Sequence, residues 1–197
     1  MISPFARFSD EDVLALIAEY PLAWVMPRSG DPLAASLLPL VIESADEKLD
    51  RLIGHLAKFN PLAAALKDDP RAVILFTGPQ AYVSPGIVSR PQWAPTWNYA
   101  QLRIEAEISF DIDIDAALDP LTEAMERGRP EPWTSAQMGD RYARMTPAII
   151  GFTAKITRIE GKFKLGQDED ATSLHEILDA HEDAAMVGWM KRMNTGR

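Results

Sequence analysis

The spacing of apolar residues predicts that this chain is built mainly from β-strands. The clearest pattern lies at 101–110, where apolar and polar residues alternate as they do along a strand with one buried face. Turn-forming residues at 27–32 and 44–48 separate three earlier apolar runs, which predicts an antiparallel meander. The full set of predicted strands is 22–26, 33–42, 49–55, 72–77, a short piece at 81–84, 101–110, and 148–165 with a bend at 160–161.

Helices are predicted at fewer places, and each begins at a residue that can cap a helix. Pro21 ends the first helix, and the turn residues at 128–130 end the third. The last predicted helix continues to Met190 as a single element. The four predicted starts are a capping box that opens at Ser9, Asn60-Pro61, Asp119-Pro120, and a second capping box formed by Ser173 and Glu176.

Six to eight short strands, few helices and no regular alternation between the two favour one fold class. We predict a mainly β (α+β) protein whose strands close, fully or partly, into a β-barrel with flanking helices. A single domain over residues 1–197 is expected, because a chain of this length with 47% apolar residues can bury one core. The sequence has no glycine-rich dinucleotide fingerprint and no phosphate loop, so a bound nucleotide would need another kind of site.

Charge and cysteine content narrow the possible chemistry. A net charge of −9 opposes phosphate backbones, so we do not expect direct DNA binding. One or two local cations could still hold a small phosphate, and the candidates are Lys58 and the group Arg158, Lys162 and Lys164. The absence of cysteine excludes disulfides, thiolate metal sites and a catalytic thiol. We expect a cytoplasmic protein, because the sequence shows neither a signal-peptide pattern nor an apolar run that could span a bilayer.

The segment at 54–61 is the first candidate site. A strand ends there, and a loop with His55 and Lys58 leads into a helix start capped by Asn60. Free backbone amides and the helix dipole favour an anion at such a position, and the Lys58 ammonium group would add a full charge. A phosphate suits this chemistry. The same residues could instead be a core histidine and a solvated lysine, and the sequence leaves both readings open.

A stiff aromatic segment at 76–99 is the second candidate site. Its prolines restrict the backbone, and Tyr82 and Trp97 offer flat apolar rings that end in a polar atom. Such a segment suits a planar, partly polar ligand, although it could also serve only to turn the chain. A weaker signal follows the last strand, where Lys164 and Gln167 could contact the edge of a heteroaromatic ring.

We predict no metal site and no catalytic residue. His175 and His181 lie six positions apart, which places them on different faces of a helix. Asp111, Asp113 and Asp115 lack the glycine and the final glutamate of an EF-hand loop, so a solvated strand edge is expected there.

Four ordered motifs give a resemblance to a known family. Pro-Thr-Trp-Asn-Tyr at 95–99 is an identical match, and Ala-Ser-Leu-Leu-Pro at 35–39 corresponds to Ala-Ser-His-Leu-Pro. Gly-His-Leu-Ala-Lys-Phe-Asn-Pro at 54–61 corresponds to Gly-His-Leu-Ala-Arg-Ala-Asn-Pro, and Gly-Pro-Gln-Ala-Tyr-Val-Ser-Pro at 78–85 corresponds to Gly-Pro-x-x-Tyr-Ile-Ser-Pro. With these motifs, most of the chain resembles the PaiB family, described as FMN-binding negative transcriptional regulators with a split β-barrel fold.

The resemblance implies a homodimer of split barrels that binds flavin mononucleotide (FMN) near the dimer interface. Lys58 stands where the family has arginine and would pair with the phosphate, helped by His55 and the amides before Asn60. The cofactor-binding residues expected in this way are Ser36, His55, Leu56, Lys58, Asn60, Tyr82, Ser84, Thr96, Trp97, Asn98, Lys164 and Gln167.

The implied function is that of an FMN-binding split-barrel protein of the PaiB type, a negative regulator of transcription that acts indirectly through a partner or a metabolite. One alternative is a flavin-dependent oxidoreductase acting on a small molecule, because the flavin itself carries redox capability. The other is a barrel without cofactor that serves as an interaction protein. The departures from the family pattern are Leu37 for histidine, Lys58 for arginine, Ile87-Val88 for an aromatic pair, Gly166 for serine and Asp168 for asparagine.

Overall fold

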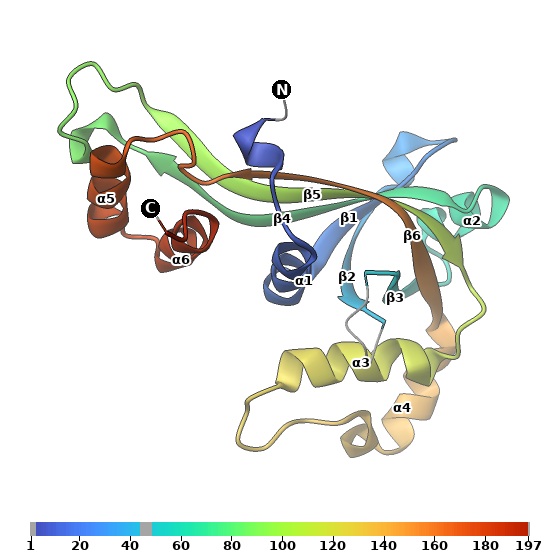
Figure 1. Ribbon diagram of the computed structural model, residues 1–197. Coiled ribbons are helices and arrows are strands. Elements are labelled where there is room, and N and C mark those ends of the chain that lie inside the picture. Colours follow the sequence, from blue (N-terminus) through green and yellow to red (C-terminus); the bar gives the residue numbers. More distant parts are fainter. Residues whose placement is uncertain (1–2, 44–48, 197) are drawn as a thin grey trace. The chain divides into compact units, whose positions relative to one another are not determined.

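Six strands form a closed barrel in the computed structural model, which describes residues 3–43 and 49–196 (Figure 1). Neighbouring strands follow the order β1-β2-β3-β6-β5-β4. The first three form the predicted antiparallel meander, and β1 closes the barrel by pairing with β4. The predicted mainly β barrel with flanking helices is confirmed. The strands are β1 (Leu22–Pro27), β2 (Ser36–Ile42), β3 (Arg51–Ala57), β4 (Arg71–Val83), β5 (Thr96–Ser109) and β6 (Ile149–Lys164).

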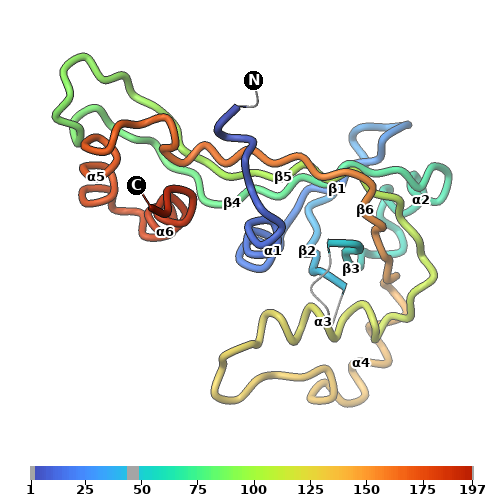
Figure 2. The backbone as a smooth tube through the Cα atoms, in the orientation of Figure 1, coloured from blue at the N-terminus to red at the C-terminus, as the bar shows by residue number. Residues whose placement is uncertain are grey.

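Six α-helices occur in the described part of the chain, and Figure 2 traces their order along the backbone. The two helices predicted after Ser9 and Asn60 are confirmed. None of the described helices has both the length and the apolar character that a membrane span requires. The helices are α1 (Asp10–Glu19), α2 (Pro61–Asp68), α3 (Ile114–Glu126), α4 (Asp140–Met145), α5 (Ala171–Ala180) and α6 (Ala184–Met193).

The chain divides into two compact units. The barrel unit comprises the described parts of 10–76 and 103–159, and the terminal unit comprises those of 1–9, 77–102 and 160–197. The strands β4, β5 and β6 contain 13, 14 and 16 residues, and each contributes residues to both units. A single domain over the whole chain stays a prediction.

Strand pairing in the barrel unit decides which side chains face outward. Trp24 of β1 pairs with Leu37 of β2, and His55 of β3 pairs with Gly151 of β6. The neighbours of Trp24 and His55 along each strand are buried, because successive side chains of a strand point to opposite faces. Trp24 and His55 therefore lie on the outer face of the barrel. The predicted turn at 44–48 lies outside the described residues.

Aliphatic and aromatic side chains fill the interior of the barrel. A Cβ atom at Gly54 would meet the side chain of Leu40 and would lie 2.7 Å from the Phe152 ring. Glycine at this position therefore makes room for the Phe152 ring. The fully or almost fully buried residues on these strands include Val25, Leu40, Leu52, Leu56, Ile74, Phe76, Ile104 and Phe152.

Helix α3 packs against the outer face of β2 and β3. Ala117 of this helix forms a cluster with Val41 of β2 and Ile53 of β3. The helix also lies close to β6, since a Cβ atom at Gly151 would lie 2.7 Å from the Ala117 Cβ. Apolar contacts and a missing side chain thus hold α3 tightly against the barrel.

Aromatic packing holds the terminal unit together. Phe163 of β6 stacks on Trp189 of α6 with 5.9 Å between ring centroids, and its ring lies 5.4 Å from that of Phe8. Asn194, which follows α6, donates a hydrogen bond from Nδ2 to the Leu165 carbonyl oxygen at 2.9 Å. These contacts fix α6 to the end of β6.

Strands β4 and β5 are longer than the sequence pattern predicted. Strand β4 runs without interruption through Gly78-Pro79, where two separate strands were expected. The fixed φ of proline is compatible with extended backbone, so a Gly-Pro pair need not end a strand. Strand β5 begins at Thr96 rather than at Gln101. Most of the Pro-Thr-Trp-Asn-Tyr motif is therefore strand and not loop.

Helix α3 also begins earlier than predicted. It starts at Ile114, with Asp113 as the N-cap residue and Asp115 in its first turn, and Pro120 lies inside it. The prediction of a solvated strand edge at Asp111, Asp113 and Asp115 was wrong. Asp113 and Asp115 lie at the start of the helix, and acidic side chains are stabilised at this positive end of a helix.

The short helix α4 was not predicted from the sequence. Tyr142 of α4 donates a hydrogen bond to the Asp115 carboxylate of α3. This hydrogen bond is the main cause that raises the pKa of Tyr142 to about 12. Six residues give too few turns for an apolar periodicity to be recognised.

The predicted C-terminal helix is in fact two helices, α5 and α6. Asp170 caps α5 by accepting a hydrogen bond from the Ser173 amide at 2.9 Å, and Asp183 caps α6. Glu176 accepts a hydrogen bond from the Ser89 amide at 2.8 Å. The predicted capping box of Ser173 and Glu176 was wrong, because the aspartate three residues earlier takes the capping position.

Candidate functional site

The twelve residues expected to bind the cofactor fall into two groups, one in each unit. Seven lie in the terminal unit and five in the barrel unit. The barrel group is Ser36, His55, Leu56, Lys58 and Asn60, and the terminal group is Tyr82, Ser84, Thr96, Trp97, Asn98, Lys164 and Gln167.

His55 has an unsatisfied polar atom. Its Nδ1 is buried, and the described residues provide no hydrogen-bond partner for it. Burial lowers the pKa of the His55 imidazole from its usual value, so the ring is neutral at pH 7. A neutral imidazole has one nitrogen that donates and one that accepts. His55 is therefore not the satisfied core histidine that the sequence allowed, because its buried Nδ1 atom lacks a partner among the described residues.

Leu56 contributes to the barrel core. Its side chain is 3% exposed and points into the interior, opposite to that of His55. Any contact of Leu56 with a ligand would have to use its backbone.

Hydrogen bonds within the chain already satisfy several amides at the start of α2. The Lys58 amide donates to the Ala148 carbonyl oxygen at 2.9 Å, and the Asn60 amide donates to the Ala57 carbonyl oxygen at 2.9 Å. The Asn60 Oδ1 atom accepts from the Leu62 amide at 2.9 Å. This helix start therefore offers an anion fewer free amides than the sequence suggested.

Ser36 and Lys58 complete the barrel group. The Ser36 hydroxyl donates to Asn60 Oδ1 at 3.1 Å, so it supports the helix cap. The Lys58 side chain is exposed. At the start of α2, the Lys58 ammonium group, rather than the backbone amides, could bind a phosphate.

Two aromatic rings lie together in the terminal unit. Tyr82 of β4 and Trp97 of β5 have ring centroids 6.1 Å apart with planes inclined at 54°. Each side chain is 51% exposed. The Tyr82 hydroxyl and the Trp97 indole N–H have no hydrogen-bond partner among the described residues. A flat ligand could thus gain both ring contacts and hydrogen bonds here.

Two lysines of β6 accompany these rings. Lys164 donates from Nζ to the Thr96 hydroxyl and to the Trp97 carbonyl oxygen, the latter at 3.2 Å. The Lys162 Nζ lies 5.4 Å from the centroid of the Tyr99 ring. We call this set the aromatic–lysine face, and its members are Tyr82, Trp97, Tyr99, Lys162 and Lys164.

Two members of this face, Tyr99 and Lys162, are not among the twelve expected cofactor-binding residues, although the alternation of side chains along a strand would have identified them. Tyr99 lies two residues after Trp97, and Lys162 lies two residues before Lys164. Side chains two apart on a strand share a face. Tyr99 was omitted because 95–99 was expected to be a loop, in which no such periodicity applies, whereas Lys162 lies in a segment that was predicted as a strand.

The other expected residues of the terminal unit are occupied by structural hydrogen bonds. Asn98 is 3% exposed and donates to the Met190 sulfur at 3.5 Å. Gln167 closes a turn, since its side chain accepts from the Leu165 amide at 2.8 Å and donates to the Phe163 carbonyl oxygen at 2.7 Å.

Ser84 has a similar local role, because its hydroxyl accepts a hydrogen bond from the Gly86 amide at 3.2 Å. The segment that follows it joins β4 to β5 and is held against α5. Arg90 forms an ion pair with Asp170 at 3.3 Å, and the Trp93 indole donates to Glu169 at 2.9 Å. These contacts limit how far the connection between Tyr82 and Trp97 can move.

The chemical groups of the candidate residues suit a flavin mononucleotide. The aromatic–lysine face combines apolar rings, unpaired polar ring atoms and two ammonium groups, which match a heteroaromatic ring with an anionic tail. In the barrel unit, the exposed Lys58 offers a separate cation that could bind a phosphate.

Comparison with known proteins agrees with this chemistry. Residues 1–158 match the model of a family described as "Putative FMN-binding domain". The "Protease synthase and sporulation protein PAI 2" of Bacillus subtilis is 27% identical over 159 residues, which cover 79% of this chain and 75% of the relative.

Solved structures share the fold. The FAD and heme binding protein from Mycobacterium smegmatis has a TM-score of 0.58 at 22% identity, covering 88% of this chain and 79% of that protein. The flavocytochrome Anf3 from Azotobacter vinelandii has a TM-score of 0.57 at 19% identity, covering 82% and 70%.

Proposed function

The chain belongs to the PaiB family of FMN-binding proteins, and we propose that this protein binds FMN with the isoalloxazine ring on the aromatic–lysine face. The observation that carries the proposal is the pair of half-exposed rings of Tyr82 and Trp97. A ring bound there would cover apolar surface and meet the free Tyr82 hydroxyl. The lysines next to these rings favour an anionic ligand over a neutral one.

The phosphate has two candidate partners. The family resemblance assigns it to Lys58, whereas Lys162 and Lys164 lie on the same face as the rings. When bound, FMN supplies hydride-transfer chemistry. The residues of this chain bind and orient it, and the Lys164 contacts to Thr96 and Trp97 hold one wall of the site in place.

A homodimer is part of this proposal. The outer face of β1 and β2 exposes Leu22, Trp24 and Leu37, whose side chains are 51%, 48% and 45% exposed. Trp24 and Leu37 are direct cross-strand partners, so the apolar surface is continuous. Exposed apolar patches of this kind are typical of protein interfaces. A second copy of the chain is the occupant that the family resemblance implies.

We also propose that any role in transcription is indirect. The net charge of −9 opposes DNA, so a partner or a metabolite would have to connect the flavin protein to a promoter. A salt-sensitive and specific mobility shift of DNA by the pure protein would contradict this part of the proposal.

The test is a titration of flavin-free full-length protein with FMN, followed by flavin fluorescence. Saturable binding at micromolar FMN is expected. Lys58→Gln, Lys162→Gln and Lys164→Gln show which cation holds the phosphate, because only its loss should weaken FMN without weakening riboflavin, which lacks the phosphate. Lys67→Gln, on α2, is the matched control. Absence of saturation at high micromolar FMN in the folded wild-type protein would overturn the proposal.

A further inference from the structure

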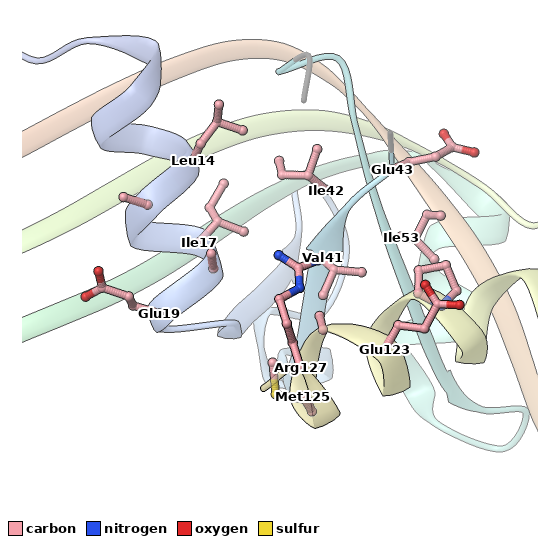
Figure 3. Close-up of a pocket in the computed structure, with 14 residues that line it drawn as sticks. Leu14, Ile17, Glu19, Val41, Ile42, Glu43, Ile53, Glu123, Met125 and Arg127 are labelled. Carbon is pink, nitrogen blue, oxygen red and sulfur yellow. The ribbon is translucent and has the colours of Figure 1, made fainter. Parts of the chain in front are cut away.

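A pocket of about 940 Å³ lies on the barrel unit (Figure 3). Helix α1 forms one wall and helix α3 the other, and strands β2 and β3 form the floor. The volume is within the range of pockets that bind drug-sized molecules, about 300–1,000 Å³. Its lining residues include none of the twelve expected cofactor contacts.

The surface of this pocket is mainly apolar. Leu14, Ile17 and Ala18 come from α1, and Val41 and Ile53 come from the floor. A further group of apolar residues from α3 closes the opposite wall, namely Pro120, Ala124 and Met125. An apolar ligand, or the apolar part of a larger one, would be desolvated on three sides.

The charged residues of the pocket are not equivalent. Figure 3 shows the Arg127 side chain reaching from the end of α3 into the middle of the pocket, whereas Glu19 and Glu43 point away from it. Glu43 is paired with Arg51 at 3.3 Å, and Glu19 also has an interaction partner. Arg127 forms no ion pair with any residue in 3–43 or 49–196. Its guanidinium group is therefore a positive charge in the pocket that lacks a counter-ion among the described residues.

We propose that this pocket binds an amphipathic monocarboxylate, such as a medium-chain fatty acid, with its carboxylate on Arg127 and its chain along the apolar floor. A guanidinium group pairs with a carboxylate through two parallel hydrogen bonds. Binding in a partly apolar pocket strengthens this pair relative to water.

The remaining acidic residues select the charge of the ligand. Glu123 also lines the pocket and is exposed. Glu43 is paired with Arg51 and Glu19 has a partner, so Glu123 is the lining carboxylate without an ion pair among the described residues. A dianion such as an alkyl phosphate would bring a second negative charge, which Arg127 does not balance, close to this carboxylate. One guanidinium group balances one carboxylate, so the monoanion is the best match.

The test is calorimetric titration of the full chain with decanoate, below its micelle concentration. Methyl decanoate, decyl phosphate and decylammonium serve as probes of head-group charge. We expect decanoate to bind in a saturable manner and each of the other three to bind more weakly. Stronger binding of decylammonium would show that the rim glutamates dominate and would overturn the proposal, as would equal binding of the methyl ester.

Variants locate the ligand. Arg127→Met keeps the apolar stem and should weaken decanoate about tenfold or more, since it removes a charge-assisted hydrogen bond. Arg127→Lys should restore part of this loss. Ala18→Phe, at an exposed position of α1 that lines the pocket, should block binding. Arg129→Met removes a cation of the same region that pairs with Glu126 and should change nothing.

Thermal midpoints of all variants show that loss of binding is not loss of folding. Unchanged affinity in both Arg127→Met and folded Ala18→Phe would overturn the proposal. A change in oligomeric state caused by Ala18→Phe would also overturn it, because the pocket would then be covered by a second copy of the chain.

Discussion

His55 of β3 lies directly across from Gly151 of β6, on the face of the barrel against which α3 packs. The missing side chain at Gly151 lets the start of α3 come close, since a Cβ atom there would also lie 3.1 Å from Ile112 Cγ2. His55 shares this crowded face and is half-buried. Its imidazole therefore lies where protonation is costly.

The stability of the protein should depend on pH through His55. Burial lowers the pKa of this imidazole below the value of about 6.5 in the unfolded chain. Below about pH 6.5 the unfolded state therefore binds more protons than the folded state. The free energy of unfolding should be level above this pH and should fall as the pH drops toward the folded-state pKa. Urea unfolding between pH 5 and pH 8 measures it.

Replacement of this histidine provides the control for the pH profile. His55→Gln cannot titrate, so its unfolding free energy should vary less between about pH 5 and 6.5 than that of the wild type. His175→Gln makes the same substitution at an exposed position of α5 and is the matched control for the exchange itself. A His55→Gln profile that overlays the wild type would show that another group causes the dependence.

The interior of the barrel should not tolerate a side chain at Gly54. Gly54→Ala forces the added methyl against Leu40 and Phe152, and overpacking of this kind costs about 1–3 kcal/mol of unfolding free energy. Gly188→Ala is the matched contrast, because a Cβ atom in this α6 position meets nothing within 4 Å. Alanine is the better helix former, so Gly188→Ala should stabilise the protein by about 0.5–1 kcal/mol. Denaturant midpoints that move in the same direction for both variants would contradict this account.

The fold was largely predictable because its strands carry strong local signals. The even residues of β5 are buried along most of its length, as the alternation over 101–110 indicated. The N-cap at Asn60 was equally predictable, since a side-chain acceptor followed by proline is typical of the start of a helix. What could not be predicted were boundaries set by partners distant in sequence. Strand β4, which neighbours β1 and β5 in the barrel, continues through Gly78-Pro79 without interruption.

The candidate site was predicted less completely for a related reason. Motifs identified Tyr82 and Trp97, but sequence alone could not show that Asn98 is covered by Met190 of α6 or that Gln167 closes a turn. From the sequence alone, a polar side chain that binds a ligand cannot be distinguished from one that forms a hydrogen bond within the fold. The pocket at Arg127 could not be predicted from the sequence either, because α1 and α3, which form its walls, are about a hundred residues apart in the chain.

Flavin affinity should depend on the rings of the aromatic–lysine face. Trp97→Leu keeps apolar bulk but removes the flat surface beside Tyr82, which should cost on the order of 1 kcal/mol, or about fivefold in Kd for FMN. Trp133→Leu, at an exposed position of the barrel unit, is the control and should bind FMN as the wild type does. Fluorescence titration measures both. Equal affinities for the two variants would place the flavin ring elsewhere.

Self-association should depend on the outer face of β1 and β2. Trp24→Glu puts a carboxylate in the centre of the apolar surface that Leu22 and Leu37 share with Trp24. Burying that charge between two copies would be costly, so the variant should be monomeric where the wild type is dimeric. Light scattering coupled to size exclusion measures the mass of each. Trp133→Glu adds the same charge at another exposed tryptophan and should remain dimeric. A folded Trp24→Glu variant with the mass of the wild-type dimer would mean that the two copies meet through a different face.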